Sequence, residues 1–288
     1  GPGAAPEGCD STDGFAEAVA TAQAADQVVL AVGETREMSG EAESRSTLDL
    51  PGKQEDLIRA IVATGKPVAV VLFNGRPLAL GDVIGDAPAW LEAWFPGVQA
   101  GNAVADVVFG KVNPGGKLPA SFPVRLGQVP IYYNHEPTGR PCNTGSKYNS
   151  RYRDLGTCDP LFPFGYGLSY TTFRVSNLDL SATTVAPNGS LKATVTVENT
   201  GDRRGDDVVQ LYIHDPVASI SQPVRRLRGF ERVTLDPGET KTITFTLDKN
   251  DFGFYDNNGK LVVEPGAIDV YAGDSSSADM TKSFTVRG

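Results

Sequence analysis

The sequence predicts an α/β sandwich domain with a mostly parallel sheet, followed by an all-β immunoglobulin or fibronectin type III-like sandwich. Up to about residue 120, apolar runs of strand length alternate with helical patterns, and after about residue 170 apolar and polar residues alternate with period two. The stretch between them has little periodicity but many Tyr, Pro, Gly and Asn residues. We therefore expect an α/β domain over 1–120, an ordered connecting loop over 121–170 and a β-sandwich over 171–288.

The first segment alternates helix and strand. Its start, 13–26 ("DGFAEAVATAQAAD"), places apolar residues on one helical face with Asp13 as the N-cap. The run "VVLAVG" follows as a strand of the kind buried on both faces. A helix over 53–65 stops at Gly65, and then come the strands "PVAVVLFNG" and "AWLEAWF" and the short helix "GNAVADVVFG". This alternation is typical of a parallel sheet with helices packed on it.

Polar, glycine-containing loops follow the three predicted strands. The loop after "VVLAVG" carries four glutamates, Glu34, Glu37, Glu41 and Glu43; "FNGRPLAL" follows the second strand and "FPGVQAGN" the third. In parallel sheets ligands collect at the carboxyl ends of the strands, so the three loops should converge at one edge. Either the glutamate loop is a solvated acidic surface, or at least one glutamate reaches into a site, and the convergence favours the second interpretation.

The connecting loop over 121–170 is too aromatic for a disordered linker. Long ordered loops of this kind are usually functional or buried against another surface. Its rings could pack on the faces of sugars, or they could simply cover the seam between the two domains. Cys142 and Cys158 lie in this loop, and we expect them to form a disulfide that closes it, with Cys9 left over. A disulfide would indicate an oxidising compartment.

The third segment alternates apolar and polar residues through about seven short strands separated by turn signals such as "LDPGE" and "DNNGK". In "LKATVTVENT" and "DDVVQLYIHD", the residues predicted to face the core are Ala193, Val195, Val197, Val209, Leu211 and Ile213. The segment contains no obvious catalytic constellation. We expect it to support the fold and to take no part in the chemistry.

Composition excludes several classes of function. The chain has 26 basic and 35 acidic residues, a net charge of −9, and its one basic cluster, "VRRLRGFER", alternates like a half-exposed strand, so we expect no nucleic acid. Three cysteines and two histidines without CxxC or HxxxH spacing predict no metal site. No GxGxxG follows the first strand, which argues against a nucleotide. No apolar run approaches the roughly 20 residues of a membrane span. A homo-oligomer is compatible with this composition.

Five motifs occur in order along the chain: "SGEAESRSTLDLPGKQ", "VLFNGRPLAL", "EAWFPGVQAGNAVADVVFGKVNPGGKLPASFP", "VPIYYNHEPTGRP" and "PLFPFGYGLSYTTF". Together they resemble the C-terminal half of family 3 glycoside hydrolases of the bacterial β-glucosidase type. The resemblance implies that an N-terminal (β/α)8 barrel carries an aspartate nucleophile, that the α/β sandwich domain carries the general acid/base, and that a fibronectin type III-like domain follows. It implies a retaining β-glucosidase that hydrolyses terminal, non-reducing β-D-glucosyl residues and needs no cofactor.

The resemblance also implies site residues. The family's acid/base glutamate sits in a loop of the form SGE followed by a few residues and an arginine, which falls on Ser39–Glu41 and Arg45. We therefore expect Glu41 to be the acid/base, with Glu34 and Glu43 as its competitors. A retaining glycosidase needs two carboxyl groups about 5–5.5 Å apart. The residues that we expect to contact a β-glucoside or oligosaccharide substrate are Ser39, Arg45, His135 and Arg151.

No (β/α)8 repeat precedes Gly1 in the sequence. We therefore expect the barrel to lie on another chain or in a missing segment, and this chain to hold one half of a two-carboxylate mechanism. The competing interpretation is a non-catalytic carbohydrate-binding or scaffold module. The predicted disulfide and the family resemblance favour a periplasmic or secreted protein.

Overall fold

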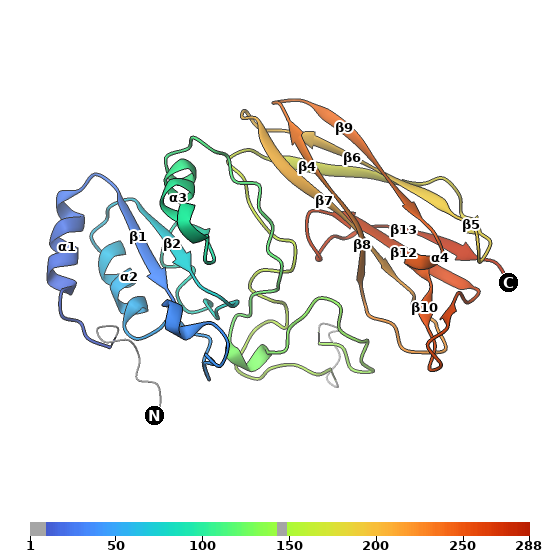
Figure 1. The fold of residues 1–288 in the computed structure, drawn as a ribbon, viewed down its shortest axis with the longest axis horizontal. Coiled ribbons are helices and arrows are strands. Elements are labelled where there is room, and N and C mark those ends of the chain that lie inside the picture. Colours follow the sequence, from blue (N-terminus) through green and yellow to red (C-terminus); the bar gives the residue numbers. More distant parts are fainter. Residues whose placement is uncertain (1–9, 143–148) are drawn as a thin grey trace. The chain divides into compact units, whose positions relative to one another are not determined.

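The computed structural model describes residues 10–142 and 149–288 and divides the chain into two compact units (Figure 1). The first unit contains the residues up to 112 together with 122–130, and the second contains 113–121 together with 131–288. The aromatic-rich stretch expected to connect two domains therefore belongs mostly to the second unit. Cys9 lies outside the described residues, as does 143–148, part of the loop between the other two cysteines.

The first unit contains a parallel sheet, as predicted, and its strand order is β1-β2-β3. Its strands are β1 (Val28–Gly33), β2 (Val68–Phe73) and β3 (Ala89–Glu92). Its helices are α1 (Phe15–Ala24), α2 (Gln54–Val62) and α3 (Ala100–Val108), with short 3₁₀ turns η1 (Arg36–Met38), η2 (Gly97–Gln99) and η3 (Leu126–Gln128). Helix α1 packs beside α2, and α2 packs against β1.

Two details of the first unit differ from the prediction. Strand β2 has most of its residues buried, but β1 leaves Val29 50% exposed. The prediction of two-sided burial is wrong for β1 because, within the described residues, it is an edge strand that pairs with β2 alone. The predicted N-cap is also wrong: Gly14, with φ 86°, occupies that position, and no side chain caps α1.

The second unit contains a β-sandwich built from two antiparallel-rich sheets with the strand orders β4-β6-β9 and β5-β13-β12-β7-β8. The long strands are β4 (Phe173–Leu180), β6 (Leu191–Asn199), β7 (Gly205–His214), β8 (Arg226–Leu235), β9 (Thr240–Leu247), β12 (Gly266–Gly273) and β13 (Met280–Val286). Shorter elements are β5 (Thr184–Val185), the hairpin β10 (Phe254–Tyr255) with β11 (Leu261–Val262), and α4 (Lys249–Phe252).

The core of this sandwich is formed by the apolar residues that alternate with polar ones along its strands. All six residues predicted to face inward are buried in one hydrophobic cluster: Ala193, Val195, Val197, Val209, Leu211 and Ile213. The cluster also includes residues of β8, β9, β12 and β13, such as Val233, Ile243, Val270 and Phe284. The predicted all-β sandwich is therefore confirmed, and its stability comes mainly from this buried apolar surface.

Many aromatic residues of the connecting stretch pack within the second unit. Tyr133 stacks on Phe164 with ring centroids 4.5 Å apart and meets Tyr212 of β7 edge-on at 5.7 Å. Phe162 and Tyr166 stack at 5.1 Å. Of the two interpretations of this stretch, these contacts favour packing for the buried rings, whereas Tyr132, 55% exposed, is left free for another role.

The motif "NPGGK" also belongs to the second unit. Lys117 Nζ forms a buried ion pair with Asp207 of β7 at 3.0 Å and donates to the carbonyl of Gly167 at 3.0 Å. The Asn113 side chain donates to the carbonyl of Arg204 at 3.1 Å. These contacts explain why residues 113–121 group with the sandwich although they follow α3 directly.

Candidate active site

A buried ion-pair cluster organises the carboxyl edge of the first unit's sheet. Glu34 follows β1 directly, and its side chain is fully buried. Its Oε1 lies 2.8 Å from Arg45 Nη1 and 3.0 Å from Arg76 Nε, and its Oε2 accepts a hydrogen bond from the backbone N–H of Gly75 at 3.0 Å. One carboxylate therefore ties the glutamate loop, the end of β1 and the loop after β2 together.

The two arginines extend this cluster into the glutamate loop. Arg76 donates to the backbone carbonyl of Met38 and, at 3.3 Å, to that of Glu43. Arg45 donates to the carbonyl of Asp49 at 2.8 Å. Glu34 thus holds the guanidinium of Arg76, which in turn holds the loop backbone on both sides of residues 39–42.

Glu41 lies in a tight turn between these two anchored points. The N–H of Glu43 donates to the carbonyl of Gly40 at 3.1 Å, and Ala42 has φ 63°, as the third residue of a type II turn requires. Glu41 is exposed, and within the described residues its carboxyl group forms no ion pair. Hydrogen bonds therefore hold the backbone of the turn, while the carboxyl group of Glu41 stays exposed. A carboxyl group held in this way is able to contact a ligand at the surface of the chain.

The start of α2 and two glycines shape the same edge. The side-chain amide of Gln54 pairs with both backbone groups of Gly33, accepting from its N–H at 2.6 Å and donating to its carbonyl at 2.9 Å. A Cβ on Gly33 would lie 1.8 Å from the carbonyl oxygen of Phe73, and one on Gly75 would lie 1.9 Å from Ser39 Oγ. Only glycine fits at either position, which accounts for "VG" and "NG" at the ends of β1 and β2.

Sequence reasoning missed one acidic residue of this edge, Glu92 at the end of β3. Its Oε1 accepts a hydrogen bond from the backbone N–H of Trp94 at 2.9 Å, and the amide of Asn74 lies against the carboxyl group. Burial raises the pKa of Glu92 to about 7, despite the hydrogen bonds from Trp94 and Asn74 that lower it. The available signal was that Glu92 is the one charged residue of the predicted strand "AWLEAWF", whereas its place at the strand end comes from the structure, in which β3 stops at Glu92.

The structure places the predicted site residues in two groups. Ser39, Glu41 and Arg45 lie together in the first unit, where Ser39 packs over Gly75 and Arg45 binds Glu34. His135 and Arg151 belong to the second unit and are exposed. The carbonyl of His135 accepts from the N–H of Val224 at 2.9 Å.

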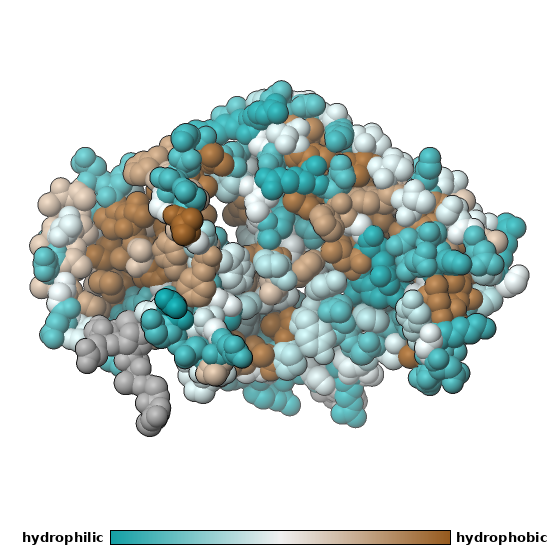
Figure 2. All heavy atoms as spheres, viewed as in Figure 1, coloured by the Kyte–Doolittle hydropathy of each residue, from teal (hydrophilic) through white to brown (hydrophobic). Residues whose placement is uncertain are grey.

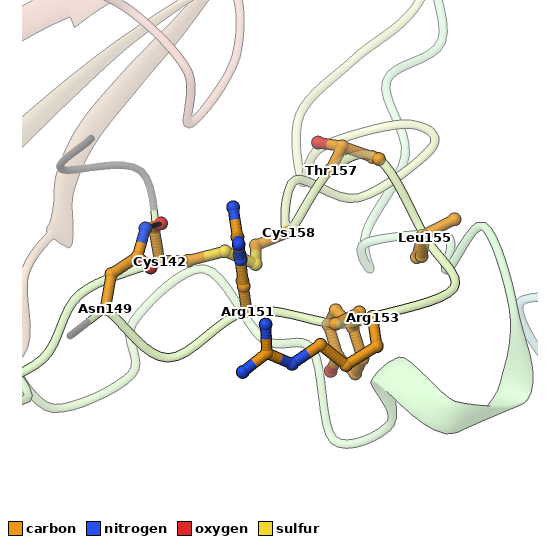
Figure 3. Close-up of a pocket in the computed structure, with 9 residues that line it drawn as sticks. Cys142, Asn149, Arg151, Arg153, Leu155, Thr157 and Cys158 are labelled. Carbon is orange, nitrogen blue, oxygen red and sulfur yellow. Dashed lines mark hydrogen bonds between the residues drawn. A yellow bond between two sulfur atoms is a disulfide. The ribbon is translucent and has the colours of Figure 1, made fainter. Parts of the chain in front are cut away.

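Arg151 lines a pocket of about 610 Å³ in the second unit (Figure 3). Its side chain stands beside the disulfide that joins Cys142 to Cys158, whose Cα atoms are 6.2 Å apart, and Arg153 and Thr157 lie on other sides of the pocket. Two guanidinium groups and the ring of Tyr152 are suited to polar, hydroxyl-rich ligands.

The described residues show neither a metal-binding cluster nor a membrane-spanning helix. Within residues 10–142 and 149–288, no three His, Cys, Asp or Glu side chains are grouped as a metal ion would require. In the same part of the chain, no helix combines the length and the apolar character of a membrane span.

Comparison with known proteins decides the family. Residues 5–170 match the glycosyl hydrolase family 3 C-terminal domain, and residues 207–276 match a fibronectin type III-like domain. The chain belongs to glycosyl hydrolase family 3. The resemblance predicted from the five motifs is confirmed, and the first family domain contains the whole of the glutamate loop.

Members of family 3 that resemble this chain are much longer. It is 50% identical over 270 residues to the periplasmic beta-glucosidase of Salmonella typhimurium, covering 93% of this chain and 35% of the relative. It is 47% identical to a beta-xylosidase of Formosa agariphila, covering 98% of this chain and 39% of that one. The beta-glucosidase of Listeria innocua in complex with glucose superposes with a TM-score of 0.91 at 43% identity, over 96% of this chain and 39% of that chain.

The disulfide between Cys142 and Cys158 gives a chemical prediction. Peptide mapping without reductant should recover the Cys142 and Cys158 peptides linked, because their Cα separation suits a disulfide. Reduction should destabilise the second unit by about 3 kcal/mol, the loop-closure value for a loop of about 15 residues. Recovery of both cysteines as alkylated free thiols from unreduced protein would rule the bridge out.

Proposed function

We propose that this chain supplies the general acid/base of a retaining β-glucosidase that hydrolyses terminal, non-reducing β-D-glucosyl residues. The observation that carries the proposal is the exposed carboxyl of Glu41, on a turn anchored on both sides by Arg76, in the sequence context SGE that the family resemblance assigns to the acid/base. In the first step Glu41 gives its proton to the leaving oxygen. In the second, as carboxylate, it takes a proton from the water that hydrolyses the glycosyl-enzyme.

The nucleophile comes from outside this chain in our proposal. The chain spans 35% to 39% of the length of the relatives compared above, and the family resemblance assigns the aspartate nucleophile to a (β/α)8 barrel. The exposed surface of the first unit suits such a partner. All nine residues of α3 are described and none is buried, while Val98 and Phe109 are 101% and 80% exposed. Hydrophobic side chains gather over α3 and its neighbours (Figure 2), as is usual for surfaces that bind another protein domain.

Substrate contacts are assigned by the same proposal. Ser39 and Arg45 flank the turn, Arg45 chiefly as an anchor because its donors face Glu34 and Asp49. The second unit has its own candidates for contact with sugar hydroxyl groups, His135 and Arg151. The relatives named as beta-glucosidases favour a glucosyl unit over the xylosyl unit named for one relative. The name of the periplasmic relative and the disulfide support a periplasmic or secreted location.

Complementation tests the proposal. Alone, the chain should not hydrolyse aryl β-glucosides, because it holds one of the two carboxyls that the mechanism needs. Adding the barrel polypeptide should restore turnover. Hydrolysis by the chain alone, free of contaminating enzyme, or no turnover by a complex of the two polypeptides shown to form, would contradict it. Xylosides assayed in parallel decide which sugar is preferred.

A further inference from the structure

An exposed aromatic ring lies beside the turn that carries Glu41. Phe95 follows β3 and is 45% exposed. A Cβ built on Gly75 would lie 2.9 Å from Phe95 Cε2 and 1.9 Å from Ser39 Oγ, so the ring and the serine hydroxyl lie over the same bare Cα. Gly75 is itself exposed, and Ser39 precedes Glu41 by two residues. The ring of Phe95 therefore lies at the base of the turn whose carboxyl group is exposed.

The backbone of the segment that carries this ring is bent and held in place. Trp94 has φ 53°, in the left-handed region that bulky side chains rarely adopt. Its N–H donates to Glu92 Oε1 at 2.9 Å, and its ring meets the buried ring of Phe122 edge-on, with centroids 5.7 Å apart. Pro96 restricts the backbone of Phe95, which precedes it, to extended conformations. Phe95 is thus fixed between a left-handed residue and a proline.

The strained backbone at Trp94 is a reason to look for a function in the residue that follows it. Strain of this kind persists where the surrounding structure enforces it, and it concentrates at functional sites. A ring that stays 45% exposed contributes less to folding by burial than a ring of the core does. An aromatic ring on a fixed backbone is, however, well suited to bind a ligand, because little conformational entropy is lost when it does so.

We propose that Phe95 is a specificity-determining residue whose ring packs against the leaving group of the β-glucoside. This rests on the proposed function, in which Glu41 protonates the leaving oxygen. The leaving group is joined to that oxygen, so it passes the residues beside the Glu41 turn. An aryl ring can stack on Phe95, and a sugar ring can pack its apolar face there. The site therefore selects leaving groups that contain a ring, aryl or glycosyl, over small alkyl alcohols.

Substrates with leaving groups of different size test this selection in the complex with the barrel polypeptide. Phe95→Leu keeps apolar bulk over Gly75 and removes the flat ring. Its kcat/KM for a nitrophenyl β-glucoside should fall about three- to tenfold, the range that corresponds to the contribution of an aromatic pair beyond its buried area. For methyl β-glucoside, whose leaving group has a single carbon, kcat/KM should stay at the wild-type value. Phe95→Tyr retains the ring and should match the wild type with both substrates.

The two steps of the mechanism separate this role from a structural one. The glycosyl-enzyme is hydrolysed after the leaving group has departed, so Phe95→Leu should raise KM for an activated aryl glucoside and leave kcat, which hydrolysis limits, unchanged. Displacement of the Glu41 turn would lower kcat as well, since Glu41 acts as the base in that step. Leu126→Ala is the matched control: Leu126 lies on η3 of the same unit and is 43% exposed, and its substitution should change neither parameter.

Several outcomes overturn the proposal. Equal losses of kcat/KM with the nitrophenyl and methyl glucosides, a lowered kcat, or a Phe95→Leu chain that fails to fold would assign the ring a structural role. Unchanged kcat/KM with weaker association of the two polypeptides would show that the ring packs on the barrel. An active complex in which Phe95→Leu matches the wild type refutes this inference alone. A wild-type complex without turnover refutes the proposed function, and this inference with it.

Discussion

Glu41→Ala, in the complex of this chain with the barrel polypeptide, should lower the rate of disaccharide cleavage by about 10²–10⁴-fold, roughly 3–5 kcal/mol of barrier. The leaving group of a disaccharide is a sugar hydroxyl, which is a poor leaving group unless its oxygen is protonated. A nitrophenolate is a good leaving group and hardly needs this protonation. The variant should therefore retain much of the glycosylation step with activated aryl glucosides, and deglycosylation should limit turnover. Azide should then restore turnover, because it attacks the glycosyl-enzyme without needing a base. The measurement is the rate as a function of leaving-group pKa, with and without azide.

Glu43→Ala is the matched control for this prediction. Glu43 is exposed, lies two residues along the same turn, and takes part in the turn through its backbone. Its substitution should change neither the leaving-group dependence nor the response to azide. If Glu43→Ala shows both effects while Glu41→Ala behaves like the wild type, the acid/base is Glu43. If neither does, the loop is a solvated acidic surface.

Glu34→Ala should destabilise the first unit by about 3–5 kcal/mol, because it leaves two arginines beside a buried position without their counter-charge. The Glu34 side chain is fully buried, and those of Arg45 and Arg76 are 15% and 22% exposed. The backbone N–H of Gly75 also loses its acceptor. Denaturant unfolding of this chain measures the change. In the complex, activity should fall without rescue by azide, since the loss is one of loop geometry.

Asp82→Ala supplies the comparison for Glu34. Asp82 forms an ion pair with Arg125 in the same unit, but the two side chains are 57% and 54% exposed. Surface pairs of this kind contribute about 0–1 kcal/mol, so the free energy of unfolding should change little. Equal losses in the two variants would show that the buried cluster contributes no more than a surface pair, and the anchoring role of Glu34 would then be wrong.

These predictions assign different roles to glutamates that lie close together in the sequence. The pattern SGE with a following arginine singles out Glu41 by resemblance, but Glu34, Glu41 and Glu43 share one polar loop with no periodicity. Tertiary contacts distinguish them. Arg76 arrives from the loop after β2, some forty residues later, and meets Glu34 and the carbonyls of Met38 and Glu43. No local pattern encodes a contact over that separation.

The β-sandwich and the parallel sheet of β1 to β3 were predictable from the sequence alone, because burial of apolar surface imposes a period of two on a half-buried strand and a continuous apolar run on a central one. The same local rule failed for β1, whose burial depends on how many neighbours a strand has. Only the tertiary structure decided that Glu34 is an internal anchor, that Glu41 is exposed on an anchored turn, and that Glu92 is half-buried beside Asn74. The physical reason is that desolvation and ion pairing depend on what surrounds a side chain in space, and at this edge the surroundings come from three strand ends far apart in the sequence.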